Sequence, residues 1–138
     1  MSRITLGHRL FKTGRIPAPL REELERENLR FALEGIPVTI TVRAFRAPGK
    51  YASLRKRRAS GAVAVTNDRL VVLGYRQTLI NLPFADPRFD ELEIETVDEG
   101  LRFALDAGDF NEDASGQVEF TLLTQRAAEI EQWIRAGR

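Results

Sequence analysis

The chain has 138 residues and an almost balanced charge, with 21 Lys and Arg against 20 Asp and Glu. Its 43% hydrophobic and 30% charged residues are typical of a globular protein and fit one domain. Cysteine is absent, which excludes disulfides, thiolate nucleophiles and cysteine-ligated zinc. No segment approaches the roughly 20 apolar residues that cross a bilayer, and residues 1–19 lack the apolar core of a signal peptide, so we expect a cytoplasmic protein.

The first part of the chain is predicted to be an arm followed by a helix. Residues 1–19 contain recurrent glycine and proline, which indicates an irregular segment. Pro19 suits a first helical turn, and we expect the helix over residues 20 to about 28. Residues 29–33 fit both a helical stripe and an alternating strand, and we favour helix followed by strand. We therefore divide the chain into an N-terminal arm, 1–19, and a domain, 20–138, with this helix as its extension.

From residue 36 onward apolar and polar residues alternate, which predicts strands. Ala-Pro-Gly at 47–49 ends the first of them, and Asn67-Asp68 suits a tight hairpin turn. Residues 108–116 are expected to be a polar loop. The predicted strands cover residues 36–46, 61–66, 70–75, 79–84, 91–96, 101–106 and 118–122.

A closing helix is predicted over residues 125–135, because its apolar residues share one helical face. Thr124 can cap its start, and Gly137 lies just past its end. Strands with one apolar face must bury that face, and curling the sheet into a barrel does so. We therefore predict a mainly β fold: a seven-stranded antiparallel barrel closed by the C-terminal helix, with Trp133 and Ile130 as the plug.

The segment 61–72, Gly-Ala-Val-Ala-Val-Thr-Asn-Asp-Arg-Leu-Val-Val, carries a family resemblance. It resembles the Leu-Thr-Asn-x-Arg-Leu hairpin of the pleckstrin-homology-like (PH-like) superfamily, especially its bacterial PH-like and GRAM-like domains, with Val65 in the place of the leucine. The order of elements and the closing helix are similar too, over roughly residues 35–135. The resemblance implies a seven-stranded barrel with a C-terminal helix that binds lipid headgroups, peptides or other proteins. It does not imply an enzyme.

The strongest local feature is a basic stretch from residue 43 to residue 58, with seven Lys and Arg and no acid. In the family that the chain resembles, the loop between the first two barrel strands carries the basic cluster of phosphoinositide-binding members. The resemblance therefore makes the corresponding loop, 50–58, the candidate anion-binding or lipid-binding site. The alternative is a solvated loop that keeps a strand edge from unwanted pairing. The candidate residues are Lys50, Arg55, Lys56, Arg57 and Arg58.

A second stretch of opposite charge lies between residues 86 and 113, with eleven acids and two bases. If the two stretches lie on different faces, the molecule has a dipole that suits oriented docking or head-to-tail self-association. The alternative is that both only solubilise loops, which we favour. Residues 109–113 begin like a calcium loop, but Ala114 and Phe120 replace the required glycine and acid, so we expect a turn.

No catalytic, metal or cofactor site is predicted. His8 is the one histidine, the glycines match no nucleotide-binding motif, and the paired carboxylates are expected to be exposed. We expect a non-catalytic binding or adaptor domain for a protein or peptide, contacted through an open strand edge and a groove beside the closing helix. The alternative is peripheral binding of anionic lipid or phosphate headgroups through loop 50–58. A nucleic-acid partner is disfavoured because Trp133 lies at a core period, and homo-oligomer formation stays open.

Overall fold

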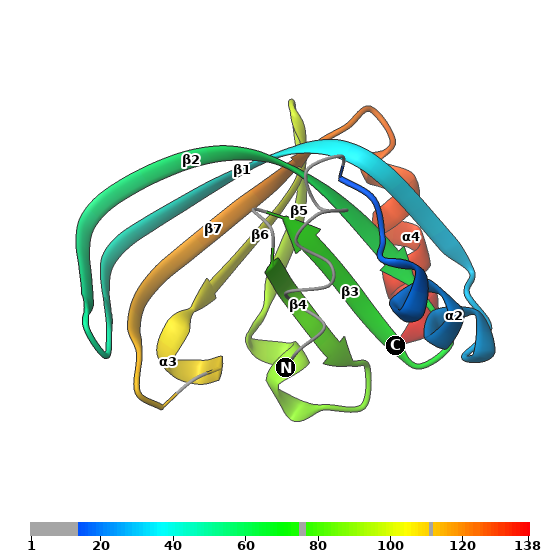
Figure 1. The fold of residues 1–138 in the computed structure, drawn as a ribbon, viewed down its shortest axis with the longest axis horizontal. Helices are drawn as coiled ribbons and strands as arrows, with labels where there is room; N and C mark the ends of the chain where they lie inside the picture. Colours follow the sequence, from blue (N-terminus) through cyan, green and yellow to red (C-terminus); the bar gives the residue numbers. More distant parts are fainter. Residues whose placement is uncertain (1–13, 75–76, 111) are drawn as a thin grey trace.

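The computed structural model describes residues 14–74, 77–110 and 112–138, without the side chains of Lys50 and Ala52. Seven antiparallel strands form one sheet, in the order β4-β3-β2-β1-β7-β6-β5, that curls into a half-barrel (Figure 1). The strands are β1 (Phe31–Ala47), β2 (Lys50–Val65), β3 (Arg69–Gly74), β4 (Gln77–Pro83), β5 (Glu93–Val97), β6 (Gly100–Asp106) and β7 (Ser115–Leu123). The helices are α2 (Ala18–Arg26), α3 (Ala107–Phe110), α4 (Ala127–Gly137) and the 3₁₀ turn η1 (Pro87–Glu91).

The mainly β fold with seven antiparallel strands and a C-terminal helix is confirmed, whereas the closed barrel is not. Among the described residues β4 and β5 end the sheet at its two edges and do not pair with each other. Pro83 ends β4 and Pro87 opens η1, so the chain leaves β4 through a 3₁₀ turn and not through a hairpin. The half-barrel is therefore open between these edges.

The inner face of the sheet forms the main core and α4 packs against it. The rings of Phe103 and Phe120 stack there with centroids 5.0 Å apart. Ile130 and Ile134 of α4 are fully buried, whereas Trp133 is half-buried and stacks on Phe31 at 6.4 Å. The predicted plug is thus corrected: the two isoleucines, and not Trp133, are its buried part.

The two ends of α4 also differ slightly from the prediction. A turn at residues 125–126 precedes the helix, and the Thr124 hydroxyl accepts a hydrogen bond from the Arg126 amide at 3.1 Å. The helix then continues to Gly137. Thr124 therefore stabilises the turn that leads into α4.

A second apolar cluster lies on the outer face of the sheet, under α2. Ile16, Leu20 and Leu24 pack there against small and branched side chains of β2 and β3. Pro17 precedes the helix and Asn28, at φ 64°, follows it, so α2 begins and ends two residues before the predicted bounds. Residues 29 and 30 are irregular and β1 begins at Phe31, which decides between the alternatives for 29–33. Most of the predicted arm, with His8, lies outside the described residues.

The turn between β2 and β3 ties α2 to the sheet through polar contacts. Thr66 is fully buried, and its hydroxyl accepts hydrogen bonds from the amides of Asp68 at 3.0 Å and Arg69 at 3.1 Å. The Arg69 guanidinium donates to the Glu27 carboxylate at 2.7 and 2.9 Å and to Glu23 at 2.8 Å. The Thr-Asn-Asp-Arg sequence therefore has a structural role: Thr66 closes the β2–β3 hairpin, and Arg69 holds α2 against the sheet.

Candidate binding surface on strand β2

The candidate basic residues lie on a strand, which corrects the predicted loop 50–58. β1 and β2 pair from Phe31 opposite Val65 to Ala47 opposite Lys50, so only Pro48 and Gly49 form the turn. Gly49 has φ 73°, which a side chain would disfavour. Because residues 55–58 are all cations, the sequence shows no alternation of apolar and polar side chains there. Pairing with β1 nevertheless makes these residues part of strand β2.

Most of β2 forms an edge of the sheet. β3 pairs only with residues 61–65, whereas β1 pairs with the whole strand and has β7 on its other side as far as Arg46. In the described part of the chain, residues 50–60 therefore pair on one side only; we call this segment the β2 edge. Figure 1 shows it curving away from β3 with the β1–β2 hairpin. Strand edges that pair on one side only can pair with a further strand.

The cations of the β2 edge are divided between the two faces of the sheet, because side chains alternate along a strand. Arg57 lies opposite Ile40, which packs against the inner core, so Arg55 and Arg57 are on the inner face. Arg58 and Lys56 lie opposite threonines of β1 on the outer face. The structure describes the backbone of Lys50 but not its side chain. The five candidate residues therefore share a strand but not a face.

Three of these cations have no partner among the described residues. Arg55, Lys56 and Arg58 are exposed, and no ion pair or hydrogen bond between described residues reaches their side chains. Arg57 is half-buried. The sequence carries no acid between residues 35 and 67, so no neighbour on β2 or on the facing part of β1 can neutralise them.

Four charged side chains on the outer face of β1, β7, β6 and β5 form a ladder of ion pairs. Glu119 of β7 accepts hydrogen bonds from Arg43 at 2.6 Å and from Arg102 at 3.1 Å, and Arg102 also donates to Glu95 at 2.9 Å. The hydrogen bond from Arg102 lowers the pKa of Glu119, and burial opposes that shift. The same hydrogen bond raises the pKa of Arg102. This ladder crosses four strands, and sequence reasoning alone did not predict it.

Two large apolar side chains accompany the cations. Tyr51 is 64% exposed and Leu54 is 58% exposed, and they are the exposed large hydrophobic residues of the described chain. The Arg46 guanidinium lies 5.2 Å from the centroid of the Tyr51 ring. Sequence reasoning missed both residues, although they stand beside the candidate cations in the sequence.

Near its tip the hairpin bends at Ala44, which has φ 49° and lies where the β1–β7 register shifts. Gly116 of β7 packs against this bend, because an added Cβ would lie 2.5 Å from the carbonyl oxygen of Ala44. Gly116 itself has φ 108°, which only glycine adopts readily. This close approach holds β1 against β7 near the tip of the hairpin.

The other sequence candidates do not form a site among the described residues. Residues 107–110 form the short helix α3, and the Gly108 amide donates to Asp106 at 2.8 Å, where a polar loop was predicted. Asn111, part of the calcium-like pattern, lies outside the described residues, and no cluster of metal-ligating side chains occurs among the rest. No helix in the described ranges has the length and apolar character needed to span a membrane.

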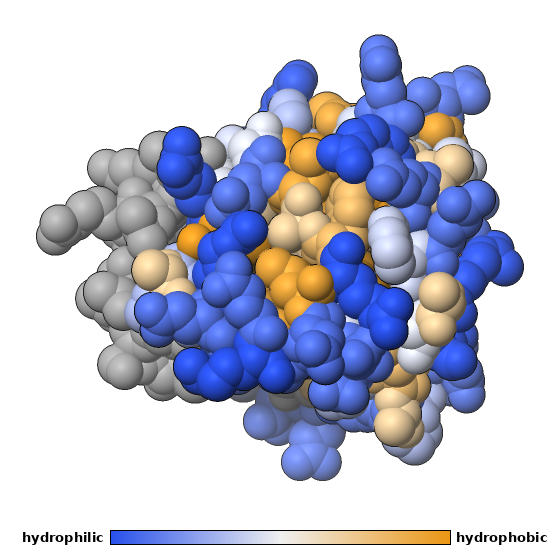
Figure 2. Space-filling view, turned by 90° about the vertical axis from the view of Figure 1, so that its right-hand side faces the viewer, coloured by the Kyte–Doolittle hydropathy of each residue, from blue (hydrophilic) through white to orange (hydrophobic). Residues whose placement is uncertain are grey.

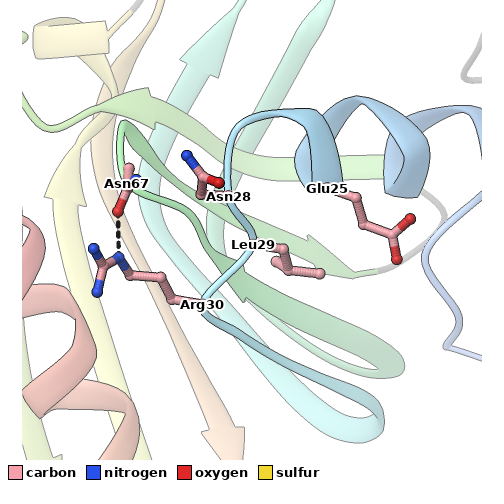
Figure 3. A pocket seen from close by; sticks show the side chains of 5 residues that line it. All are labelled: Glu25, Asn28, Leu29, Arg30 and Asn67. Carbon is pink, nitrogen blue, oxygen red and sulfur yellow. Dashed lines mark hydrogen bonds between the residues drawn. The ribbon is translucent and has the colours of Figure 1, made fainter.

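The groove expected beside the closing helix is not among the pockets found in the described residues, because the depression near the end of α2 is lined by no residue of α4. Figure 2 shows the side of the molecule that carries α2 and α4, where hydrophilic side chains frame an apolar area. An open depression between the end of α2 and the β2–β3 turn is lined by residues that include Glu25, Leu29 and Arg30 (Figure 3). Arg30 donates a hydrogen bond to the side chain of Asn67 there, so this cation is already engaged.

No protein-family model matches the chain, and no curated protein matches it. The geometry of the β2 edge is therefore the basis on which a function can be inferred.

Proposed function

We propose that the chain is a non-catalytic binding domain that takes up an acidic, extended protein segment as an added strand on the β2 edge. The observation that carries the proposal is the combination of one-sided backbone pairing at residues 50–60 with exposed, unpartnered cations on the same segment. Strand addition satisfies the outward backbone groups of an edge and places alternate side chains of the guest on both faces.

The division of the cations between two faces favours a strand over a flat anionic surface. A guest strand lies about 4.8 Å from its host and presents side chains above and below the sheet. Consecutive acidic residues would therefore reach Arg55 on the inner face and Lys56 and Arg58 on the outer face. A flat surface laid against one face would contact only the cations of that face. Opposite charges on neighbouring strands each contribute roughly 0.2–1 kcal/mol.

The PH-like fold is part of the same proposal. Seven antiparallel strands, a C-terminal helix packed inside the curl, and the Thr-Asn-Asp-Arg hairpin agree with the resemblance seen in the sequence. The open half-barrel and the helix α2 on the outer face depart from the simplest form of that fold.

A second candidate function is peripheral binding to an anionic lipid surface, and the exposed Tyr51 and Leu54 favour it. Amphipathic and apolar side chains beside cations suit the interface of a bilayer. In that case the hairpin would approach the surface edge-on, with its long cationic side chains reaching toward the headgroups from both faces.

Fluorescence anisotropy with a labelled peptide of glutamate and threonine tests the proposal. We expect salt-sensitive binding that weakens about tenfold when Arg55, Lys56 and Arg58 are all changed to Gln. Alternate N-methylation of the peptide on one edge, with its charges unchanged, should abolish binding, and methylation on the other edge should not. Equal binding of both methylated peptides would exclude strand addition.

Vesicles separate the second candidate from the first. Co-sedimentation with phosphatidylserine vesicles, compared with neutral phosphatidylcholine vesicles, measures lipid binding directly. Binding to the anionic vesicles without binding to the peptide would replace the strand proposal with the lipid one.

A further inference from the structure

The β5 edge of the sheet carries a charge opposite to that of the β2 edge. β5 ends the sheet, and in the described part of the chain it pairs only with β6. Glu93 and Glu95 are exposed on it, and Glu95 lies on the outer face opposite Arg102. Ile94 and Thr96 alternate with them, and the Thr96 hydroxyl contacts Glu131 of α4 at 2.7 Å. β5 is therefore a short acidic edge strand.

The acids of β5 and the outer cations of β2 lie in the same rows across the sheet. One row runs from Glu93 through Ala104, Glu119 and Thr41 to Lys56. The next row runs from Glu95 through Arg102, Thr121 and Thr39 to Arg58. Each row therefore begins with an acid at one edge and ends with a base at the other, on the same face.

We propose that the β5 strand of a second copy of this chain pairs with the β2 edge, head to tail, so that the sheet continues from one molecule into the next. This inference rests on the proposed function, because it names the acidic strand that the β2 edge takes up. Five successive strands from β5 to β2 alternate in direction, so β5 and β2 are parallel and the new pair is parallel too. Glu93 of one copy then lies beside Lys56 of the next, and Glu95 beside Arg58.

Charge makes this contact selective. Two β2 edges repel each other, and so do two β5 edges, because like charges on neighbouring strands are destabilising. Only the unlike pair is attractive. The contact is heterologous, since different surfaces meet, and the curl of the sheet rotates each copy relative to the last. Five residues of β5 make a small interface, so the association is weak and depends on concentration and salt.

Sedimentation velocity of the full chain tests the inference. The wild type should associate at high protein concentration in about 0.01 M salt and dissociate in about 1 M salt, where the Debye length falls from about 30 Å to about 3 Å. The double variants Lys56→Gln with Arg58→Gln, and Glu93→Gln with Glu95→Gln, should each need about tenfold more protein to associate. The control, Asp98→Asn with Glu99→Gln, removes two exposed acids from the β5–β6 turn and should behave as wild type.

Mixing the two double variants gives the decisive result. Each retains the edge that the other lacks, so the mixture should form a 1:1 heterodimer that does not grow further. A wild type that stays monomeric in low salt, or a mixture without heterodimer, would overturn the inference. If the wild type is monomeric but still binds the acidic peptide, the proposed function stands without this partner. If it binds neither, both fail.

Discussion

The paired ladder on the outer face and the β2 edge use the same residue types differently. Across β1, β7, β6 and β5, arginines and glutamates meet within hydrogen-bond distance, and Glu119 receives two guanidinium groups. On β2 the exposed cations have no described acid within reach. The chain has nearly equal numbers of acids and bases. The difference between the two regions therefore comes from where the charges lie and not from their number. The ladder contributes to stability, whereas we propose that the β2 edge serves a partner.

Removing the centre of the ladder should have the larger effect on folding. Glu119→Gln loses charge-assisted hydrogen bonds to two arginines, and we expect a loss of about 1 kcal/mol of unfolding free energy at neutral pH. The folded-state pKa of Glu119 is lowered, so its contribution is present at neutral pH and decreases as the pH falls below the unfolded pKa and through the folded one.

Urea unfolding of wild type and variant from neutral to acidic pH measures that contribution. The difference between them should shrink toward zero in acid. Glu95→Gln is the matched control, because Glu95 is more exposed and meets one arginine, and its effect should be about 0.5 kcal/mol or less. A constant difference across the pH range would mean that the ionised carboxylate is not the source of the stability.

Removing the free cations should have the smallest effect on folding. We expect the triple change of Arg55, Lys56 and Arg58 to Gln to alter the unfolding free energy by less than about 0.5 kcal/mol, because exposed unpaired charges contribute little. The same urea titration checks it. A loss as large as that of Glu119→Gln would show that these cations support the fold, and the contrast between the two regions would disappear.

The sequence predicted the elements that have their own periodic pattern. The strands on either side of Gly100 alternate clearly and occur close to their expected positions. The β-rich run at Leu70 was also predicted correctly as a strand, whereas β2 begins at Lys50 and not at residue 61. The closing helix was also predicted, but the predicted burial of Trp133 was too high. A large aromatic residue at a core position of the helical repeat can lie at the rim of the core, and here Ile130 is more deeply buried.

The sequence did not predict features that depend on tertiary pairing. Four consecutive cations at residues 55–58 look like a loop, and only the regular register with β1 makes them a strand with two faces. Likewise, the β2 edge is open because β3 pairs with only residues 61–65 of β2, and no local sequence pattern indicates where that pairing ends. Partners in the ladder lie up to 76 residues apart, so Arg43 and Glu119 could not be matched from sequence. The cations of the candidate site were therefore predictable, but neither their arrangement nor the exposed Tyr51 and Leu54 were.

Amide hydrogen exchange of the β2 edge, with and without the acidic peptide, tests the central claim most directly. Amides of residues 50–60 that point away from β1 should become protected when the peptide is present, while those already bonded to β1 should change little. The triple Gln variant at Arg55, Lys56 and Arg58 should show weaker protection at the same peptide concentration. Unchanged exchange at residues 50–60 under saturating peptide, or protection confined to another strand, would contradict strand addition at the β2 edge.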